Sequence, residues 1–366
     1  MKNVLFITLI IHAILHIFGF IKAFNIIAIN TTFLPISRKQ GILWLVTGLL
    51  LLVSAELLFL NREYWWLYGL VAVVFSQSLV VINWEDAKYA TLINLLLCGI
   101  TLSGFGAWNF HTLYKEDVAA ELSGPMVAES LLKEEDMAHL PSLVQKYIRY
   151  TGSVGKKKVV NFRCDMQGEL RKKEGAWMPF SSEQFNFMKS GARYFFMRAK
   201  MKELPVTGFH RFKDGKASMD IRLFSLVKVQ YADGVAMDQS ETVTFLNDMC
   251  CLAPSTLIDR RITWLQIDSQ RVKATFANRN IKVSAYLYFN AKGELVNFTS
   301  DDRYAVDDDG KMTRLPWSTP LKDYRDINGY RLATYAETVY EYPEGDFCYG
   351  RFFIKSIRYN YKDPKH

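Results

Sequence analysis

Four long apolar stretches occupy the first third of the chain, at about residues 4–27, 41–60, 64–83 and 89–110. Crossing a bilayer takes roughly 20 mostly apolar residues, because every backbone polar group must be satisfied inside the helix. The connections at 61–63 and 84–88 are very short, so spans two to four are expected to be antiparallel neighbours. The pattern predicts a four-helix transmembrane domain over residues 1–110.

From residue 158 onward, apolar and polar positions alternate with a period of two. The even positions of 160–170 are mostly apolar and the odd ones polar, and the same alternation returns in 271–276 and 281–289. Gly-containing turn signals such as Asp214-Gly215 and Asn328-Gly329 separate these runs. Such spacing is typical of antiparallel strands joined by hairpins. We predict about ten strands over 158–366, interrupted by a helical or irregular segment at 238–259.

Residues 111–157 lie between these two regions and are predicted to form a polar linker with short helices. Acidic residues are frequent over 112–136, and Ser123-Gly124-Pro125 breaks the pattern. Pro141 suits the first turn of a second short helix. The predicted fold class is therefore membrane α plus antiparallel β: a four-helix transmembrane bundle, then a soluble curved β-sheet (half-barrel) domain with two or three short helices.

A sheet this wide must curl or close, and something must cover its apolar face. The predicted helices at 127–150 and 238–259 are short, which leaves room for a hydrophobic cavity. Filling of a closed barrel by its own side chains is an alternative that stays open. Aromatic residues that would line such a cavity are Phe185, Phe187, Tyr194, Phe196, Tyr286 and Tyr288.

The charge distribution changes the picture little. The first 110 residues contain six Lys/Arg and four Asp/Glu, and the remaining 256 contain 39 and 33. The basic excess is spread out, so we expect no nucleic-acid partner and name membrane lipids as the partners, with the oligomeric state open. An even number of spans places the β domain on the side of the N-terminus, and the Lys/Arg balance slightly favours a non-cytoplasmic location for it.

Several polar residues fall at membrane depth, where they are costly and suggest a purpose. His12 and His16 share one face of the first span, and Lys22, Gln77 and Asn94 are expected at a common depth, with Asp86 placed to pair with Lys22. The functional interpretation is a polar pocket or proton path. The alternative is hydrogen bonding that only holds the helices together. The two histidines do not match His111 in depth, so no haem is expected.

The sequence contains no motif of a known catalytic class. GxSxG, P-loop and GxGxxG patterns are absent, and the five cysteines form no metal-binding spacing, so we expect no metal and no cofactor. Asp301, Asp302, Arg303, Asp323, Tyr324 and Glu337 are predicted to converge on one sheet edge. Arg303 and Asp323 are the weak candidates for acid–base chemistry there, and exposed ion pairs explain the same residues.

Certain residue runs resemble a bacterial family of uncharacterised membrane proteins. They include His16–Phe24, Pro35–Arg38, Gly41–Trp44 and Trp84–Lys88 in the apolar region, and Ile262–Trp264, Pro316-Trp317 and Gly329–Arg331 in the β region. In outline, the β region is similar to the lipoprotein-carrier half-barrels of the LolA/LolB type. That resemblance implies lipid chains held on a concave sheet, and it assigns no activity.

The leading functional hypothesis is a membrane-anchored binding module for a hydrophobic ligand, such as a lipid or acyl chain. One alternative is a membrane enzyme or transporter that uses the polar layer of the helix bundle. Another is a structural membrane protein that docks a partner. An enzyme is the less favoured class, because no catalytic constellation is evident in the β region.

Overall fold

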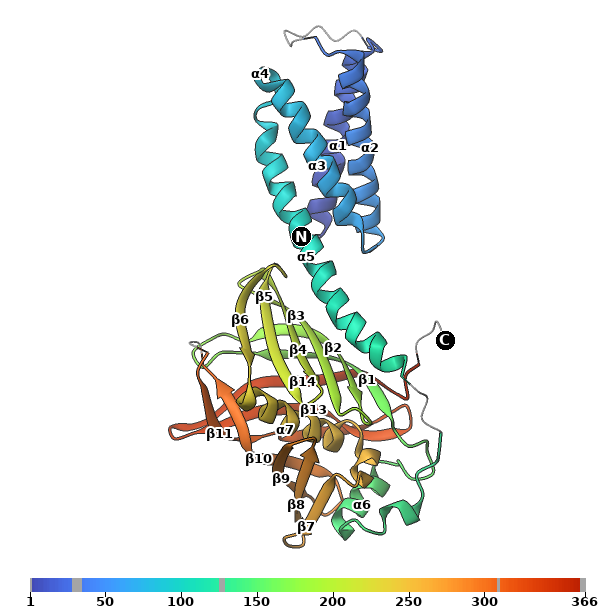
Figure 1. Cartoon of the computed structure of the whole chain (residues 1–366), viewed down its shortest axis with the longest axis vertical. Helices are drawn as coiled ribbons and strands as arrows, with labels where there is room; N and C mark the ends of the chain where they lie inside the picture. The colour runs from blue at the N-terminus through green and yellow to red at the C-terminus, as the bar shows by residue number, and fades with distance from the viewer. Residues whose placement is uncertain (1, 28–34, 125–128, 308–309, 363–366) are drawn as a thin grey trace. The chain divides into compact units, whose positions relative to one another are not determined.

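A computed structural model describes residues 2–27, 35–124, 129–307 and 310–362 of the chain (Figure 1). The chain divides into two compact units, Met1–Thr112 and Leu113–His366. Each unit is described by itself below.

The first unit is helical. Its helices are α1 (Lys2–Ala23), α2 (Arg38–Phe59), α3 (Trp65–Ile82), the short α4 (Trp84–Ala87) and the beginning of α5 (Ala90–Leu122). Among the described residues, α1, α2, α3 and α5 are long and apolar enough to cross a membrane, as predicted from the apolar stretches. Their inward faces form a small core that includes Leu9, Leu51 and Leu97, whereas large apolar side chains such as Ile11 and Leu95 remain exposed.

The helix α5 extends twelve residues beyond the predicted end of the fourth span. The predicted polar linker is therefore wrong over 111–122, which is regular helix. Tyr114 and Val118, spaced i, i+4, are buried on one side of this extension. The acidic residues that suggested a linker occupy the remaining positions of an amphipathic helix. Further along, α6 (Ser142–Tyr150) begins directly after Pro141, and a 3₁₀ turn, η1 (Glu134–Met137), precedes it.

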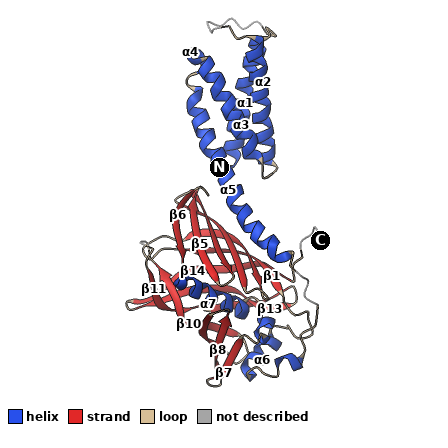
Figure 2. Ribbon diagram, in the orientation of Figure 1, coloured by secondary structure: helices blue, strands red, loops and turns tan. Residues whose placement is uncertain are grey.

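The second unit is built on one curled antiparallel sheet with fourteen strands, coloured red in Figure 2. Strands β6-β5-β4-β3-β2-β1-β14-β13-β11-β10-β9-β8-β7 are neighbours in that order, and β12 pairs with β13. The strands are β1 (Asn161–Leu170), β2 (Met178–Phe187), β3 (Ala192–Met201), β4 (Leu204–Lys213), β5 (Lys216–Leu223), β6 (Val227–Asp233), β7 (Ile262–Gln266), β8 (Arg271–Asn278), β9 (Ile281–Phe289), β10 (Leu295–Val306), β11 (Met312–Ser318), β12 (Leu321–Ile327), β13 (Tyr330–Tyr342) and β14 (Gly345–Tyr359).

The half-barrel prediction is confirmed, but the predicted number of about ten strands is too low. The short strands β6, β7, β11 and β12 have five to seven residues each, and most of their side chains are exposed or half-buried. An edge or rim strand that buries little of either face does not need alternating apolar and polar residues, so the period of the sequence does not reveal it.

The interrupting segment, predicted to be helical or irregular, is helical. It forms α7 (Val235–Cys251) and the 3₁₀ turn η2 (Pro254–Ile258). Figures 1 and 2 show α7 inside the curve of the sheet, where it packs against β5, β6, β9 and β10. The main hydrophobic core lies between this helix and the sheet, and includes Phe212, Phe245 and Phe276. We call the sheet face toward α7 the inner face.

Candidate functional site

The helix α7 is buried although it is rich in polar residues. Asp238, Glu241 and Asp248 are 3%, 1% and 7% exposed. A charge in a protein interior must be paired, because the loss of hydration would otherwise be prohibitive. The inner face of the sheet therefore has to supply partners, and residues of β2, β3, β4 and β5 supply them. Asp238, for example, accepts hydrogen bonds from the Ala217 amide at 2.6 Å and Lys216 Nζ at 2.9 Å.

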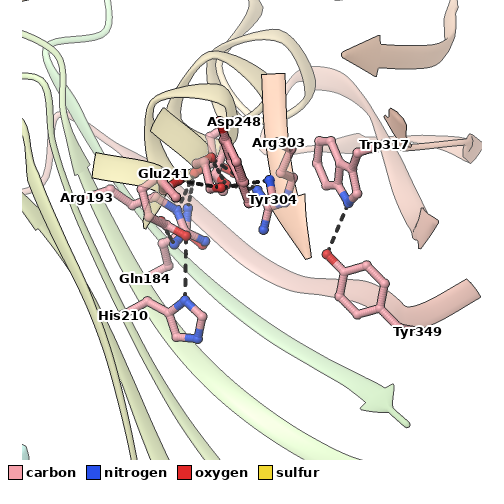
Figure 3. Close-up of polar contacts among 12 residues, drawn as sticks. Gln184, Arg193, His210, Glu241, Asp248, Arg303, Tyr304, Trp317 and Tyr349 are labelled. Atoms are coloured by element: carbon pink, nitrogen blue, oxygen red, sulfur yellow. Dashed lines mark hydrogen bonds and ion pairs between the residues drawn. The ribbon is translucent and has the colours of Figure 1, made fainter. Parts of the chain in front are cut away.

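Arg193 lies at the centre of the first cluster, which we call the buried network (Gln184, Asn186, Arg193, Glu241 and Asp248; Figure 3). Its Nε donates to Asp248 Oδ2 at 2.7 Å, its Nη1 to Glu241 Oε2 at 3.1 Å, and its Nη2 to Gln184 Oε1 at 3.0 Å. Gln184 Nε2 and Asn186 Nδ2 also donate to Asp248 Oδ2, at 2.8 and 3.0 Å. One arginine of β3 thus binds two of the three carboxylates of α7, Glu241 and Asp248, and also Gln184 of β2.

The two carboxylates of the buried network differ in pKa. Burial alone would raise the pKa of Glu241, but the charge of Arg193 and the contacts with His210 lower it to about 2. For Asp248, burial outweighs Arg193 and raises the pKa above its ordinary value. His210 Nδ1 lies 3.6 Å from Glu241 Oε1, and its side chain is 21% exposed. His210 lies beside the buried network and is thus more exposed than any of its five members.

A second cluster, the Arg303 cage, consists of Arg303, Trp317, Tyr340 and Tyr349. The guanidinium centre of Arg303 lies 4.4 Å from the Trp317 ring, and its Nε donates to the Tyr340 hydroxyl at 3.1 Å. Tyr340 and Tyr349 are stacked, with ring centroids 5.1 Å apart, and Trp317 Nε1 donates to the Tyr349 hydroxyl at 3.1 Å. The Arg303 Nη1 donates to Thr244 Oγ1 and to the Ser240 carbonyl, which ties the cage to α7.

The buried network and the Arg303 cage provide fixed hydrogen-bond donors and cations. No group of three or more His, Cys, Asp or Glu suited to a metal ion occurs within the described residues. Fixed charges and hydroxyls beside an apolar surface are the arrangement that orients a bound molecule.

The predicted convergence of Arg303 with Asp323 is wrong. Arg303 points from β10 toward α7, whereas Asp323 is an exposed residue of β12 with a positive φ of 58°. Asp302 instead accepts a hydrogen bond from Arg314, and Glu337 accepts one from Tyr335. Neighbouring residues along a strand face opposite sides, and β12 lies off the main strand order, so the sequence could not reveal these separate environments.

The aromatic residues predicted to line a cavity lie on the opposite face of the sheet from α7. Gln184, Asn186 and Arg193 contact α7, so the residues that alternate with them point to the other side of the sheet. These are Phe185, Phe187, Tyr194 and Phe196. On that outer face, Phe196 lies 5.5 Å from the Tyr114 ring of α5, and Tyr194 donates to Glu121 at 3.2 Å. Tyr286 and Tyr288 alternate with the core residues Ala285 and Leu287 and likewise lie outside.

Sequence reasoning missed Arg193, Glu241 and Asp248. The signal was present: three carboxylates, Asp238, Glu241 and Asp248, fall within the segment 235–252, and positions 182, 184 and 186 of β2 are polar. Aromatic residues were assumed to mark the core face. Here they mark the face covered by the α5 extension, because that helix also needs an apolar surface.

The structure brings together His12, His16, Gln77 and Asn94 of the predicted polar layer. His12 and His16 each lie within hydrogen-bond distance of Ser76 Oγ, at 3.3 and 2.9 Å, and Asn94 Oδ1 lies 3.1 Å from His12. Asn94 Nδ2 donates to Gln77 Oε1 at 3.0 Å. Ser76, which joins the two histidines to Asn94, was not predicted. Lys22 lies in the last turn of α1 and Asp86 in α4, and their pairing stays a prediction.

Among solved structures, the chain is similar to a LolA superfamily protein from Nitrosomonas europaea. The identity is 11%, the match covers 61% of this chain and 96% of the other, and the TM-score is 0.33. It is also similar to a β-barrel-like protein of the domain of unknown function DUF1849 from Brucella abortus. That identity is 9%, with 56% and 99% of the two chains covered and a TM-score of 0.17. No curated protein matches the chain.

One family match spans the α6 region, α7 and most of the curled sheet. The family described as "Family of unknown function (DUF6544)" matches residues 130–352. These residues include both the buried network and the Arg303 cage. Since the match covers more than half of the sequence, the chain belongs to the DUF6544 family.

Proposed function

We propose that this protein is a membrane-anchored binding module that holds a hydrophobic ligand, a lipid or an acyl chain, on the inner face of its curled sheet. The observation that carries the proposal is the incomplete cover that α7 gives to this face. Its contacts with β2 and β3 involve Gln184, Asn186 and Arg193, at one end of each strand.

The other end of the inner face is apolar and partly exposed. Phe352 pairs with Gly168, and its ring contacts Phe180 at a centroid distance of 5.2 Å. Met178, Ile221 and Tyr342 are partly buried against the same core. Apolar side chains that remain accessible on the concave side of a sheet favour occupation by a hydrophobic molecule.

Methionines make this surface adaptable. Met166 and Met197 both pair with Ser182 across neighbouring strands, so their side chains share the inner face. Gly208 opposite Met197 adds no side chain of its own, and a Cβ there would lie 3.1 Å from Met197 Cε. Unbranched thioether side chains fill irregular gaps and re-pack around different apolar shapes. A surface of this kind suits flexible acyl chains.

The energetics of such binding are sufficient. Burial of one methylene is worth about 0.8 kcal/mol, so ten methylenes would contribute about 8 kcal/mol before the costs of association. The four apolar helices would keep the module at a bilayer, where such ligands are abundant. The anchor thus raises the local ligand concentration and removes the need for very tight binding.

Photo-cross-linking of the full-length protein in lipid nanodiscs would test the proposal. A fatty acid with a diazirine in its chain is added and irradiated, and the labelled peptides are identified by mass spectrometry. We expect adducts on inner-face peptides that contain Met197, Ile221 or Phe352, and competition by unlabelled fatty acid. Adducts confined to α1–α5, without competition, would contradict the proposal.

A matched pair of variants controls for folding. Ile221→Glu places a charge on the inner face and is expected to reduce labelling of the β strands about tenfold. Val229→Glu makes the same change at a 49% exposed position of β6 and should leave labelling unchanged. Thermal unfolding of both variants shows whether a lost signal reflects a lost fold.

A further inference from the structure

Arg303 differs from Arg193 in the nature of its partners. Arg193 touches two carboxylates, whereas the hydrogen bonds of Arg303 go to a tyrosine hydroxyl, a threonine hydroxyl and a backbone carbonyl. No carboxylate among the described residues lies within 4.0 Å of the Arg303 guanidinium, and its Nη2 makes no hydrogen bond within the same residues. The charge of Glu241 interacts electrostatically with Arg303, but only at longer range. Arg303 is thus a partly buried cation whose contacts are all uncharged.

The aromatic residues of the Arg303 cage hold this cation in place and add a donor. Trp317 supports the guanidinium plane, and Tyr340 fixes its Nε. The Tyr349 hydroxyl accepts the Trp317 indole N–H, so its own proton is available to an incoming acceptor, since none of the described residues accepts it. Guanidinium and hydroxyl donors arranged together on a rigid aromatic support are well suited to an oxyanion with two or more oxygens.

The cage lies next to the uncovered apolar part of the inner face. Leu315 is the cross-strand partner of Arg303, and Tyr349 lies three residues before Phe352 on β14. An amphipathic molecule whose acidic end reaches Arg303 would therefore place its chain along Leu315 and Phe352. Two buried hydroxyls, Ser182 Oγ and Thr338 Oγ1, have no hydrogen-bond partner in the described part of the chain. Both lie on inner-face positions of β2 and β13, as the pairing of Ser182 with Met197 and of Thr338 with Gly350 indicates.

We propose that Arg303 Nη2 and the Tyr349 hydroxyl bind the acidic head group, a carboxylate or a phosphate, of the ligand held on the inner face. This inference rests on the proposed function and specifies it: the ligand is an anionic amphiphile rather than a neutral one. The acidic oxygens would replace water at the Arg303 cage, and the chain would cover the apolar strands.

Three probes with the same dodecyl chain test the inference: dodecanoic acid, dodecyl phosphate and dodecanol. Each competes with the diazirine fatty acid for cross-linking to the β strands of the full-length protein in nanodiscs at pH 7.5. We expect at least one acidic probe to compete about tenfold more strongly than the alcohol, since charge-assisted hydrogen bonds stabilise a complex by one to two orders of magnitude. Which acid competes better distinguishes a carboxylate from a phosphate head group.

Substitutions of Arg303 then test whether this residue causes the preference for acidic probes over dodecanol. Arg303→Gln should remove the preference for the acids while dodecanol competes as before, which also shows that the inner face is intact. Arg303→Lys should keep part of the preference, because it retains the charge and loses the planar fork. Arg314→Gln, at a 53% exposed arginine paired with Asp302 on the neighbouring strand, is the matched control and should change nothing.

The outcomes separate the two proposals. If all three probes compete equally in the wild-type protein, hydrophobic binding stands and the head-group site is overturned. If no probe competes and no strand is labelled, the proposed function itself fails. If dodecanol no longer competes in Arg303→Gln, that substitution has damaged the inner face itself. The test then rests on Arg303→Lys, in which the ratio of competition by the acids to competition by the alcohol is measured. A ratio equal to the wild-type value there would overturn the role of the guanidinium.

Discussion

Asp117 of α5 and Arg211 of β4 form a two-pronged ion pair. Arg211 Nε donates to Asp117 Oδ2 at 2.6 Å, and Nη2 donates to Oδ1 at 2.9 Å. Lys213 Nζ adds a third contact, 3.6 Å from Oδ1. Together with the burial of Tyr114 and Val118, this pair attaches the C-terminal extension of α5 to the outer face of the sheet. The part of α5 that follows Thr112 is thus an integral part of the β unit.

Breaking this pair should destabilise the β unit modestly. Asp117→Asn removes the charge and weakens both hydrogen bonds, and we expect a loss of about 1 kcal/mol, because Arg211 is 39% exposed and partly screened. The matched control is Asp268→Asn, which weakens a more exposed pair with Arg271 and should change the stability by less than about 0.5 kcal/mol. Chemical denaturation, monitored by the fluorescence of the β unit, measures the free energy of unfolding of both variants. Equal effects for the two variants would show that the α5 contact adds no stability.

Glu241 makes the stability of the β unit depend on pH in the acid range. Its pKa of about 2 lies below the ordinary value of 4.5, so it stabilises the folded state fully above pH 4.5. That contribution, about 3 kcal/mol, is lost as the pH falls from 4.5 toward 2. The raised pKa of Asp248 acts in the opposite sense, because its protonation in the folded state favours folding as the pH falls.

The variant Glu241→Gln separates the two carboxylates. At pH 7 it should be less stable by about 3 kcal/mol, since Arg193 loses one of its two buried anionic partners. Its stability should then fall less steeply than that of the wild-type protein between pH 4.5 and 2. Thermal unfolding at pH 7, 5, 4 and 3 measures both effects. Parallel pH profiles for the two proteins would contradict the lowered pKa of Glu241.

The histidine layer of the helical unit is expected to hold helices together. His16→Leu removes the contact with Ser76 Oγ, and an interhelical hydrogen bond of this kind is worth about 1 kcal/mol. The variant should therefore unfold slightly more easily in detergent, while acyl-chain cross-linking to the β strands remains unchanged. Ser76→Ala, which removes the shared partner of both histidines, is the companion variant. Loss of cross-linking in His16→Leu at unchanged stability would instead indicate a functional role for the layer.

The sequence by itself determined the helices and strands that are marked by a regular pattern of apolar and polar residues. Four apolar stretches predicted the helices α1, α2, α3 and α5, because backbone polar groups in a bilayer leave no alternative to a helix. Period-two alternation predicted the curled antiparallel sheet, and the break near residue 238 predicted the helical segment that is α7. The proximity of His12 to His16, and of Gln77 to Asn94, also followed from spacing along the helices.

Only the tertiary structure decided which face of the sheet is the inner one. Phe185 and Gln184 are neighbours on a strand whose two faces are both covered, because Gln184 contacts α7 and the buried Phe185 ring packs against Tyr361. Alternation is then present on both faces, and the pattern does not say which set of side chains faces the core. Arg193 and Asp248, 55 residues apart, meet because a strand and a helix cross inside the curve of the sheet. A contact of that separation depends on the path of the whole chain, which no local pattern contains.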